Sequence, residues 1–255
     1  MKEKVILFRI ESVLFVRKNQ LHFLQESVLK ESFSESFSIE MVCDKIDAMV
    51  RKESALPGRG RRSAMKQREL LNFLGKLERL KTNGRHSVTA GGVPESVAAH
   101  AWRLSVFALL LLPEFPEIDG DKLIRMCLIH DFGEAVTGDI PSFWKTKEHE
   151  DTEENAVAAL LLDLPEPQRG ELSALFAEMD ALETQEARLY KALDKMEAVI
   201  QHNESDISTW IPLEYDLQQT YATENAAEFP YLRELRTLML EDTKQKIEQA
   251  KEHKK

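Results

Sequence analysis

The chain has 255 residues, which is long enough for one substantial core plus an extension. Its 44 acidic residues outnumber 34 basic ones, giving a net charge of −10, and this balance argues against general binding to nucleic acid or anionic membranes. Two cysteines, Cys43 and Cys127, supply neither a disulfide framework nor a zinc motif, so we expect a reducing, cytoplasmic setting. The longest apolar run, 106–112, is far short of the roughly 20 residues that span a bilayer.

Residues 1–64 differ in composition from the rest of the chain. They contain 12 basic and 9 acidic residues, a Ser/Phe-rich stretch at 32–38 and a Gly/Arg segment at 57–62 that resembles a linker. No sustained hydrophobic period and no metal-ligand candidate singled out below occur there. The sequence therefore predicts a disordered or loosely packed N-terminal extension over 1–64 and the main domain over 65–255.

From Met65 onward the apolar residues recur with a helical period. The first amphipathic helix ends near Asn83 and Gly84, where the helix-breaking residues begin. We expect further helices at about 96–112, from 119 onward, and at 150–162, 167–180, 184–203 and 229–251. No convincing alternating strand follows residue 65, so the predicted class is all-α.

A run of polar residues follows the apolar segment 123–129, which has the composition of a buried helix. Such residues must be paired or bind an ion to offset the loss of water. If the helix continues, its spacing lets His130, Asp131 and Glu134 face one cavity, and Gly138 ends it. The alternative is that His130 is a core histidine with Asp131 as its hydrogen-bond partner.

Two more candidate metal ligands lie on apolar helical faces. His100 stands within Val-Ala-Ala-His-Ala-Trp, and Asp194 stands within Tyr-Lys-Ala-Leu-Asp-Lys-Met. Each has a structural alternative: a lone histidine on an apolar face is usually part of the core, and Asp194 could pair with Lys191 or Lys195. Their order along the chain, together with the His-Asp doublet, favours the ligand interpretation.

Three segments in this order resemble the HD-domain metal-dependent phosphohydrolases, and within them the 5'-deoxynucleotidase-like branch, over residues 65–215. The segments are Pro94 to His100, His130 to Pro141, and Glu186-Ala187 followed by Lys191 to Glu197. The resemblance implies a helical bundle that binds one divalent ion through His100, His130, Asp131 and Asp194. Two imidazoles and two carboxylates suit Mn, Co, Fe, Ni or Zn better than Ca or Mg.

The resemblance also implies catalytic roles for Glu134 and Asp139. Glu134 would orient or deprotonate the attacking water and protonate the leaving oxygen, and Asp139 would contact the nucleoside sugar. As structural alternatives, Glu134 would only hold His100 or His130, and Asp139 would only cap the turn before Pro141.

Arg85 and Lys145 match the positions of the family's substrate-binding cations. A guanidinium can bind two phosphate oxygens at once, and an ammonium acts as a point charge, although either residue could instead be an ordinary surface charge and Lys147 lies close to Lys145. The family's Arg is usually followed by Trp, whereas here Arg85 is followed by His86. This departure puts the sugar specificity in question.

The sequence thus predicts an all-α phosphohydrolase that releases phosphate from a nucleoside 5'-monophosphate, with water as the nucleophile and 2'-deoxyribose preferred. The alternatives are another nucleotide substrate, such as a triphosphate or a ribonucleotide, and a non-catalytic metal-binding protein of the same fold. We expect a small-molecule nucleotide as partner, with no nucleic acid and no membrane. An amphipathic C-terminal helix predicts a homodimer; its apolar residues are Tyr231, Leu232, Leu235, Leu238 and Leu240.

Overall fold

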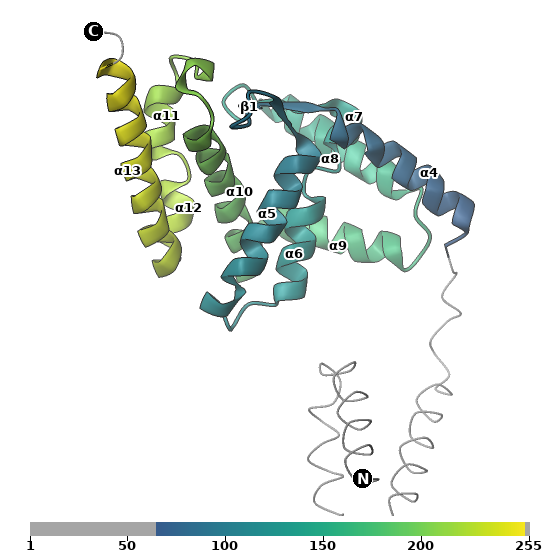
Figure 1. The fold of residues 1–255 in the computed structure, drawn as a ribbon. Coiled ribbons are helices and arrows are strands. Elements are labelled where there is room, and N and C mark those ends of the chain that lie inside the picture. The colour runs from purple at the N-terminus through teal and green to yellow at the C-terminus, as the bar shows by residue number, and fades with distance from the viewer. Residues whose placement is uncertain (1–64, 253–255) are drawn as a thin grey trace, which may run out of the picture. The chain divides into compact units, whose positions relative to one another are not determined.

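A computed structural model describes residues 65–252 of the chain (Figure 1). This part is built from helices and one two-stranded sheet, which confirms the predicted all-α class. The extension predicted for residues 1–64 lies outside the described residues.

The helices follow one another with short connections. The first group is α4 (Gln67–Leu77), η1 (Glu78–Lys81), α5 (Val97–Leu111), η2 (Leu112–Glu114), α6 (Gly120–Ile129) and α7 (Glu134–Thr137). The second group is α8 (Lys147–Leu161), α9 (Gln168–Ala181), α10 (Gln185–Glu204), η3 (Ile207–Thr209), α11 (Glu214–Thr220), α12 (Thr223–Ala227) and α13 (Pro230–Glu252). A hairpin of β1 (Gly84–Val88) and β2 (Pro94–Ser96) precedes α5.

The main core lies where α5, α6 and α10 pack together in the middle of the molecule (Figure 1). These helices carry apolar side chains that lose all contact with solvent, which is the largest favourable contribution to folding. The fully buried members include Leu104, Leu123, Met126, Leu189, Leu193 and Met196. The candidate ligand His100 lies on α5, Asp194 lies on α10, and the His130-Asp131 doublet directly follows α6. The core therefore fixes these ligands relative to one another.

The helix ends agree with local capping chemistry. Ser96, Asp119 and Thr184 accept hydrogen bonds from backbone N–H groups in the first turns of α5, α6 and α10. These caps fix where the helices begin. The predicted helices at 96–112 and 184–203 differ from α5 and α10 by a residue or so at each end.

The prediction of one helix that runs through the His-Asp doublet to Gly138 is wrong, because the helix is interrupted. α6 ends at Ile129 and α7 begins at Glu134, with turns between them. Gly133 lies against α8: a Cβ atom there would meet Glu153 Cγ at 2.8 Å and the Glu153 carbonyl at 3.1 Å. The break lets residues 130–133 pack closely on α8. Gly138, with φ of +78°, ends α7.

The hairpin β1–β2 is an element that the sequence analysis missed. Its strands are antiparallel, with Gly84 opposite Ser96 and Val88 opposite Pro94, and the ladder is irregular between these pairs. Five and three residues are too few for an alternating pattern to stand out, and Gly84 and Pro94 are weak strand formers. The hairpin matters because β1 carries Arg85 and His86.

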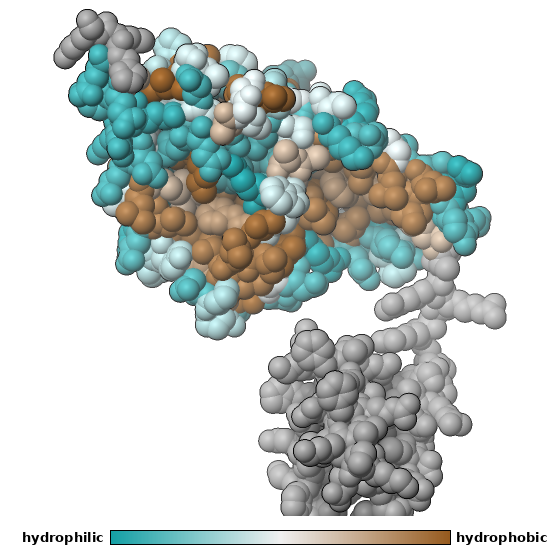
Figure 2. Space-filling view, in the orientation of Figure 1, coloured by the Kyte–Doolittle hydropathy of each residue, from teal (hydrophilic) through white to brown (hydrophobic). Residues whose placement is uncertain are grey.

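One described helix is long and apolar enough to cross a membrane by length and composition alone, namely the segment Val97–Glu114. Two of its side chains, His100 and Arg103, form ion pairs with Glu197 of α10, and His100 is fully buried. A core helix of a helical bundle passes the same test, and α5 packs in the bundle. Figure 2 shows apolar surface where α5 and α6 lie, and Leu110 is 71% exposed.

Candidate metal centre

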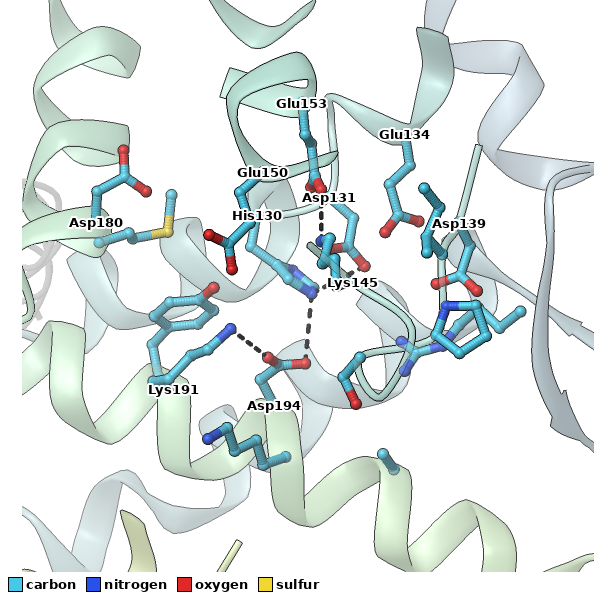
Figure 3. A pocket seen from close by; sticks show the side chains of 18 of the residues that line it. His130, Asp131, Glu134, Asp139, Lys145, Glu150, Glu153, Asp180, Lys191 and Asp194 are labelled. Atoms are coloured by element: carbon cyan, nitrogen blue, oxygen red, sulfur yellow. Dashed lines mark hydrogen bonds and ion pairs between the residues drawn. The ribbon is translucent and has the colours of Figure 1, made fainter. Parts of the chain in front are cut away.

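Side chains from two helices, α5 and α10, and from the turn after α6 converge on a single point. Nε2 of His100 lies 3.3 Å from Nε2 of His130 and 3.2 Å from Oδ1 of Asp194. Nε2 of His130 lies 3.0 Å from Oδ2 of Asp131 and 3.7 Å from Oδ1 of Asp194. Figure 3 shows His130, Asp131 and Asp194 pointing toward one another, so residues 94 positions apart in sequence form one cluster.

These spacings fit a shared divalent ion. Nitrogen and oxygen ligands lie about 2.0–2.2 Å from an ion such as zinc, so neighbouring ligand atoms are separated by roughly 3 Å or slightly more. Without an ion, two imidazole nitrogens at 3.3 Å require one of them to donate to the other or to a carboxylate. The donor set is therefore compatible with a borderline transition metal.

The other ring nitrogens of both histidines are occupied. Nδ1 of His100 donates to Oε2 of Glu197 at 2.5 Å, and Nδ1 of His130 donates to the carbonyl of Cys127 at 3.0 Å. Such bonds fix the tautomer and leave Nε2 free for a metal. The pairing of His130 with Asp131 considered as an alternative is also present, since Nε2 lies 3.0 Å from Oδ2 of Asp131, and the ligand role of His130 stays a prediction.

Asp194 uses its two carboxylate oxygens differently. Oδ1 faces the histidines, whereas Oδ2 accepts a hydrogen bond from Lys191 at 3.0 Å. The pairing with Lys191 considered as an alternative is present, and the same carboxylate also reaches the cluster. Burial raises the pKa of Asp194, but Lys191, His100 and His130 outweigh burial and hold this pKa well below its usual value.

The electrostatics of the cluster keep its carboxylates ionised. Burial raises the pKa of Asp131, but His130, His100 and Arg85 outweigh burial and lower this pKa well below its usual value. Burial and Arg85 lower the pKa of His100, yet its hydrogen bonds to Asp194 and Glu197 raise it to about 9. A cation is thus favoured at this position, whether a proton or a metal ion.

Glu134 is a buried carboxylate beside this cluster. Its side chain is 3% exposed, and within the described part of the chain Oε2 has no hydrogen-bond partner. Burial, together with the charges of Asp131, Asp139 and Glu153, raises the pKa of Glu134 to about 10. The alternative role of holding His100 or His130 is not what the geometry shows, because Glu197 and Cys127 hold these rings.

One open pocket of about 810 Å³ connects the predicted site residues. It is lined by Arg85, His86, His130, Asp131, Glu134, Asp139, Lys145 and Asp194, and His100 lies fully buried behind them. Lys145 pairs with Glu153 at 2.5 Å and is 27% exposed, whereas Lys147 pairs with Asp151 on the surface and is 74% exposed. Lys145 therefore lines the pocket, whereas Lys147 lies on the solvent-exposed surface.

Asp139 follows Gly138 and points toward the same pocket (Figure 3). Burial raises its pKa, and the positive charges of Arg85 and Lys145 oppose this effect. Its side chain makes no hydrogen bond among the residues described, so capping of the turn before Pro141 is not seen.

His86 lines the pocket close to one acidic and two aromatic side chains, and its buried Nε2 has no hydrogen-bond partner among the described residues. Its Nε2 lies 3.2 Å from Oε1 of Glu214, and its ring meets Phe143 and Trp144 edge-on at centroid distances of 5.6 and 6.0 Å. Trp102 and Trp144 are 65% and 60% exposed, and neither lines this pocket, whereas Phe143 does.

Three residues of α10 surround the site, and of these only Lys191 was named from the sequence, as a possible partner of Asp194. Lys191 pairs with Asp194, Glu197 holds His100, and the buried ring of Tyr190 lies 5.6 Å from the ring of His130. All three lie on α10 within about one turn of Asp194, so helical spacing from that residue was the available signal.

Comparison with known proteins gives the family. The sequence matches the HD domain family over residues 77–234, which is more than half of the chain. The chain belongs to the HD domain family. This membership agrees with the His100, His130-Asp131 and Asp194 order on which the predicted resemblance was based.

Relatives of this HD domain carry names that describe an activity. Human 5'-deoxynucleotidase HDDC2 is 33% identical over 142 residues, which cover 54% of this chain and 68% of the human protein. The Schizosaccharomyces pombe 5'-deoxynucleotidase hdd1 is 30% identical over 58% of this chain and 83% of its own. A solved structure of a predicted metal-dependent phosphohydrolase from Magnetospirillum magnetotacticum is 27% identical, with a TM-score of 0.60 over 70% of this chain and 93% of that one.

Proposed function

We propose that this HD domain is a metal-dependent phosphomonoester hydrolase that releases phosphate from nucleoside 5'-monophosphates, with deoxyribonucleotides preferred. The observation that carries the proposal is that the Nε2 atoms of His100 and His130 lie 3.3 Å apart and each lies within 3.0 to 4.0 Å of Asp131 Oδ2 and Asp194 Oδ1, beside a buried carboxylate and a cation-lined pocket. The relatives named 5'-deoxynucleotidase support the choice of substrate.

The side chains that would hold the metal are His100, His130, Asp131 and Asp194. A divalent ion at this position would polarise a phosphoryl oxygen and bring the pKa of a coordinated water to about 7. Lys191 and Glu197 keep Asp194 and His100 in the orientation that ligation requires.

Glu134 is the proton-transfer residue in this proposal. Its buried, unpartnered Oε2 can accept the proton of the attacking water, and the protonated acid can then donate to the leaving sugar oxygen. With a pKa of about 10 in the metal-free protein, Glu134 holds the proton that it would donate to the leaving oxygen. A metal ion in the neighbouring site would lower this pKa and favour the carboxylate that accepts a proton from water.

Four cationic side chains line the pocket, namely Arg85, Lys145, Lys191 and Lys195, and the first three are the candidates for the phosphate. Arg85 is 16% exposed, and although burial lowers its pKa, Asp131, Glu197 and Glu95 outweigh burial and keep the guanidinium charged. Lys145 and Lys191 line the same pocket. Asp139, on the loop after α7, is placed for a contact to the sugar, and His86 forms the wall beyond Arg85.

The finer features of the proposal concern the ion, the cell compartment and the assembly. The two-imidazole, two-carboxylate set favours Mn, Co, Fe, Ni or Zn. Cys127 is buried as a free thiol, which is compatible with the cytoplasm. A homodimer formed through α13 would use Tyr231 and Leu238, which are exposed, because Leu232 is fully buried in the core of its own chain.

For the domain organisation, we propose that residues 65–255 form the catalytic domain and that residues 1–64 are dispensable. All nine predicted site residues lie between Arg85 and Asp194, within the family match. A protein that begins at Met65 should keep its helical circular dichroism signal and its phosphatase activity. Aggregation or loss of that signal would show that the first 64 residues cover part of the core.

A phosphate-release assay tests the function. The metal-free protein is loaded with Mn, Co, Fe, Ni, Zn or Mg in turn and offered deoxyribonucleoside, ribonucleoside and triphosphate substrates, with Glu134→Gln as the matched catalytic control. We expect release from monophosphates and a loss of about 10² to 10⁴ in turnover for Glu134→Gln. Release only from triphosphates would favour the alternative substrate class, and binding of metal without any release would favour the non-catalytic alternative.

A further inference from the structure

Glu95 is a buried carboxylate that the proposed mechanism does not use. It is 2% exposed, and its Oε2 accepts a hydrogen bond from Ser87 Oγ at 2.8 Å and lies 3.6 Å from Nε of Arg85. Arg85 and Ser87 are two residues apart on β1, so both reach the face toward which Glu95 of β2 points. The hairpin thus places a fixed negative charge beside the proposed phosphate-binding guanidinium.

Glu95 also lies next to the carboxylate that holds the metal ligand His100. Ligand atoms of Glu95, His100 and Glu197 all lie within 4.8 Å of one another, and all three side chains are buried. Glu197 is bonded to His100 at 2.5 Å and to Nε of Arg103 at 2.5 Å. Two buried carboxylates therefore stand side by side, one against Arg85 and one against His100.

The backbone connects these groups directly. Glu95 immediately precedes Ser96, whose side chain caps the first turn of α5, and His100 follows one turn later. β1 is tied to α10 as well, because Gln201 Nε2 donates to the Val88 carbonyl at 2.7 Å. Because β1 pairs with β2, and β2 runs directly into α5, a shift of Arg85 would also disturb the helix that carries His100.

A buried carboxylate without a cationic partner would be costly, so its location needs a reason. Burial and the neighbouring charge of Glu197 raise the pKa of Glu95, while Arg85 and Ser87 lower it. Arg85 offsets the cost of burying Glu95, and Glu95 in turn restricts the guanidinium to one orientation. Preorientation of this kind lowers the entropy cost of binding an anion.

We propose that Glu95 is a positioning residue for phosphate recognition: it aims the Arg85 guanidinium into the pocket and, beside Glu197, fixes its distance from the His100 imidazole. The inference rests on the proposed function for its substrate. It divides the two buried carboxylates by role, with Glu95 acting on the phosphate through Arg85 and Glu197 acting on the metal through His100.

The test compares Glu95→Gln with Glu197→Gln in the full chain. Each variant is titrated calorimetrically with Mn²⁺ in its metal-free form, its Tm shift by inorganic phosphate is measured after Mn loading, and kcat and KM for dAMP are determined. For Glu95→Gln we expect an unchanged Mn affinity, a reduced phosphate-dependent Tm shift, and a KM raised about tenfold with a smaller change in kcat. For Glu197→Gln we expect a Mn affinity weakened by about 10- to 100-fold.

Three further variants separate positioning from general destabilisation. Glu95→Asp keeps the charge and should restore part of the lost KM, and Glu95→Gln should add little in an Arg85→Met background. The matched control is Glu186→Gln, which removes a carboxylate paired with Lys122 at 3.2 Å outside the pocket and should change none of these measurements.

Two results would overturn the inference. One is an equal loss of Mn affinity in Glu95→Gln and Glu197→Gln, and the other is a KM and a phosphate-dependent Tm shift that Glu95→Gln leaves unchanged. If Glu95→Gln does not fold, Ser87→Ala, which removes the hydrogen bond to Glu95, should raise KM in the same direction, and an unchanged KM would again overturn it. If the wild type releases no phosphate from any nucleotide, the proposed function fails, while the Mn and inorganic phosphate measurements still decide the role of Glu95.

Discussion

His100 and Glu197, 97 positions apart in the sequence, share a hydrogen bond of 2.5 Å between Nδ1 and Oε2 in the core between α5 and α10. Because a carboxylate only accepts, Nδ1 carries a proton, and Nε2, which faces Asp194 and His130, is the nitrogen that a metal ion can bind in place of a proton. The bond orients His100 as a metal ligand. It also buries the Glu197 carboxylate, whose other oxygen accepts a hydrogen bond from Nε of Arg103.

Removal of Asp194 should strip the ion although the residue is far from the His-Asp doublet in sequence. Its Oδ1 is the atom of α10 that reaches both histidines, so the Asp194→Ala site would keep only three ligands. We expect metal affinity to fall by more than the roughly 100-fold that loss of an outer partner causes. Elemental analysis after dialysis and calorimetric titration with Mn²⁺ measure this.

The matched control is Asp216→Ala, which removes an exposed carboxylate of α11 outside the pocket. It should retain the metal content of the wild type. A folded Asp194→Ala protein with unchanged metal content would exclude Asp194 from the ligand set.

In the metal-free protein, Glu134 should make stability depend on pH. Its pKa in the folded state is about 10, above the ordinary value of 4.5, so between these values the folded state holds a proton that the unfolded state has lost. The free energy of unfolding therefore falls as pH rises, by up to about 1.4 kcal/mol per pH unit. Glu134→Gln stays neutral and lacks this contribution.

The measurement is urea unfolding of both proteins in chelator from pH 5 to pH 9. We expect the variant to gain stability relative to the wild type as pH increases, with the smallest difference at pH 5. Parallel curves across this range would show that Glu134 is not held in its neutral form in the empty site.

The sequence was sufficient to predict the class, the long helices and the order of the candidate ligands. Helical period and capping residues such as Ser96 and Thr184 are local features, so they can be recognised without the fold. The interruption between α6 and α7 could not be predicted, because it depends on the contact of Gly133 with α8. The partners Glu197 and Glu95 were likewise missed, since the histidine and the arginine that they contact lie on other elements and meet them only in the folded chain.

Lys145 and Lys147, which the sequence could not distinguish, should differ in their effect on substrate binding. Lys145 lines the pocket and is paired with Glu153, whereas Lys147 is mostly exposed and pairs with Asp151 one turn later. Lys145→Met should raise KM for a nucleoside monophosphate by about tenfold, because one charged hydrogen bond to phosphate is lost. Lys147→Met is the matched control and should leave KM unchanged.

Steady-state kinetics at constant ionic strength decide between the two lysines. Equal effects of both substitutions would indicate a general electrostatic contribution of the loop, and no effect of either would remove Lys145 from the phosphate site.

His86 follows Arg85, where the resemblance described above predicts Trp, and we expect it to weaken discrimination against ribonucleotides. A broad apolar wall that crowds the 2'-hydroxyl discriminates by only about 10²-fold, and it does so by leaving the hydroxyl without space or a partner. The imidazole is smaller and can donate or accept a hydrogen bond. In the structure it lines the pocket, close to Glu214 and edge-on to the rings of Phe143 and Trp144.

We therefore expect measurable activity on the ribo form, and a sharper deoxyribose preference in His86→Trp. The measurement is kcat/KM for dAMP and for AMP in both proteins, with Phe143→Leu as a companion because Phe143 lines the pocket and its ring lies 5.6 Å from that of His86. A wild type selective by far more than 10² whose ratio His86→Trp leaves unchanged would show that His86 does not contact the sugar. Loss of that selectivity in Phe143→Leu would then assign the wall to Phe143.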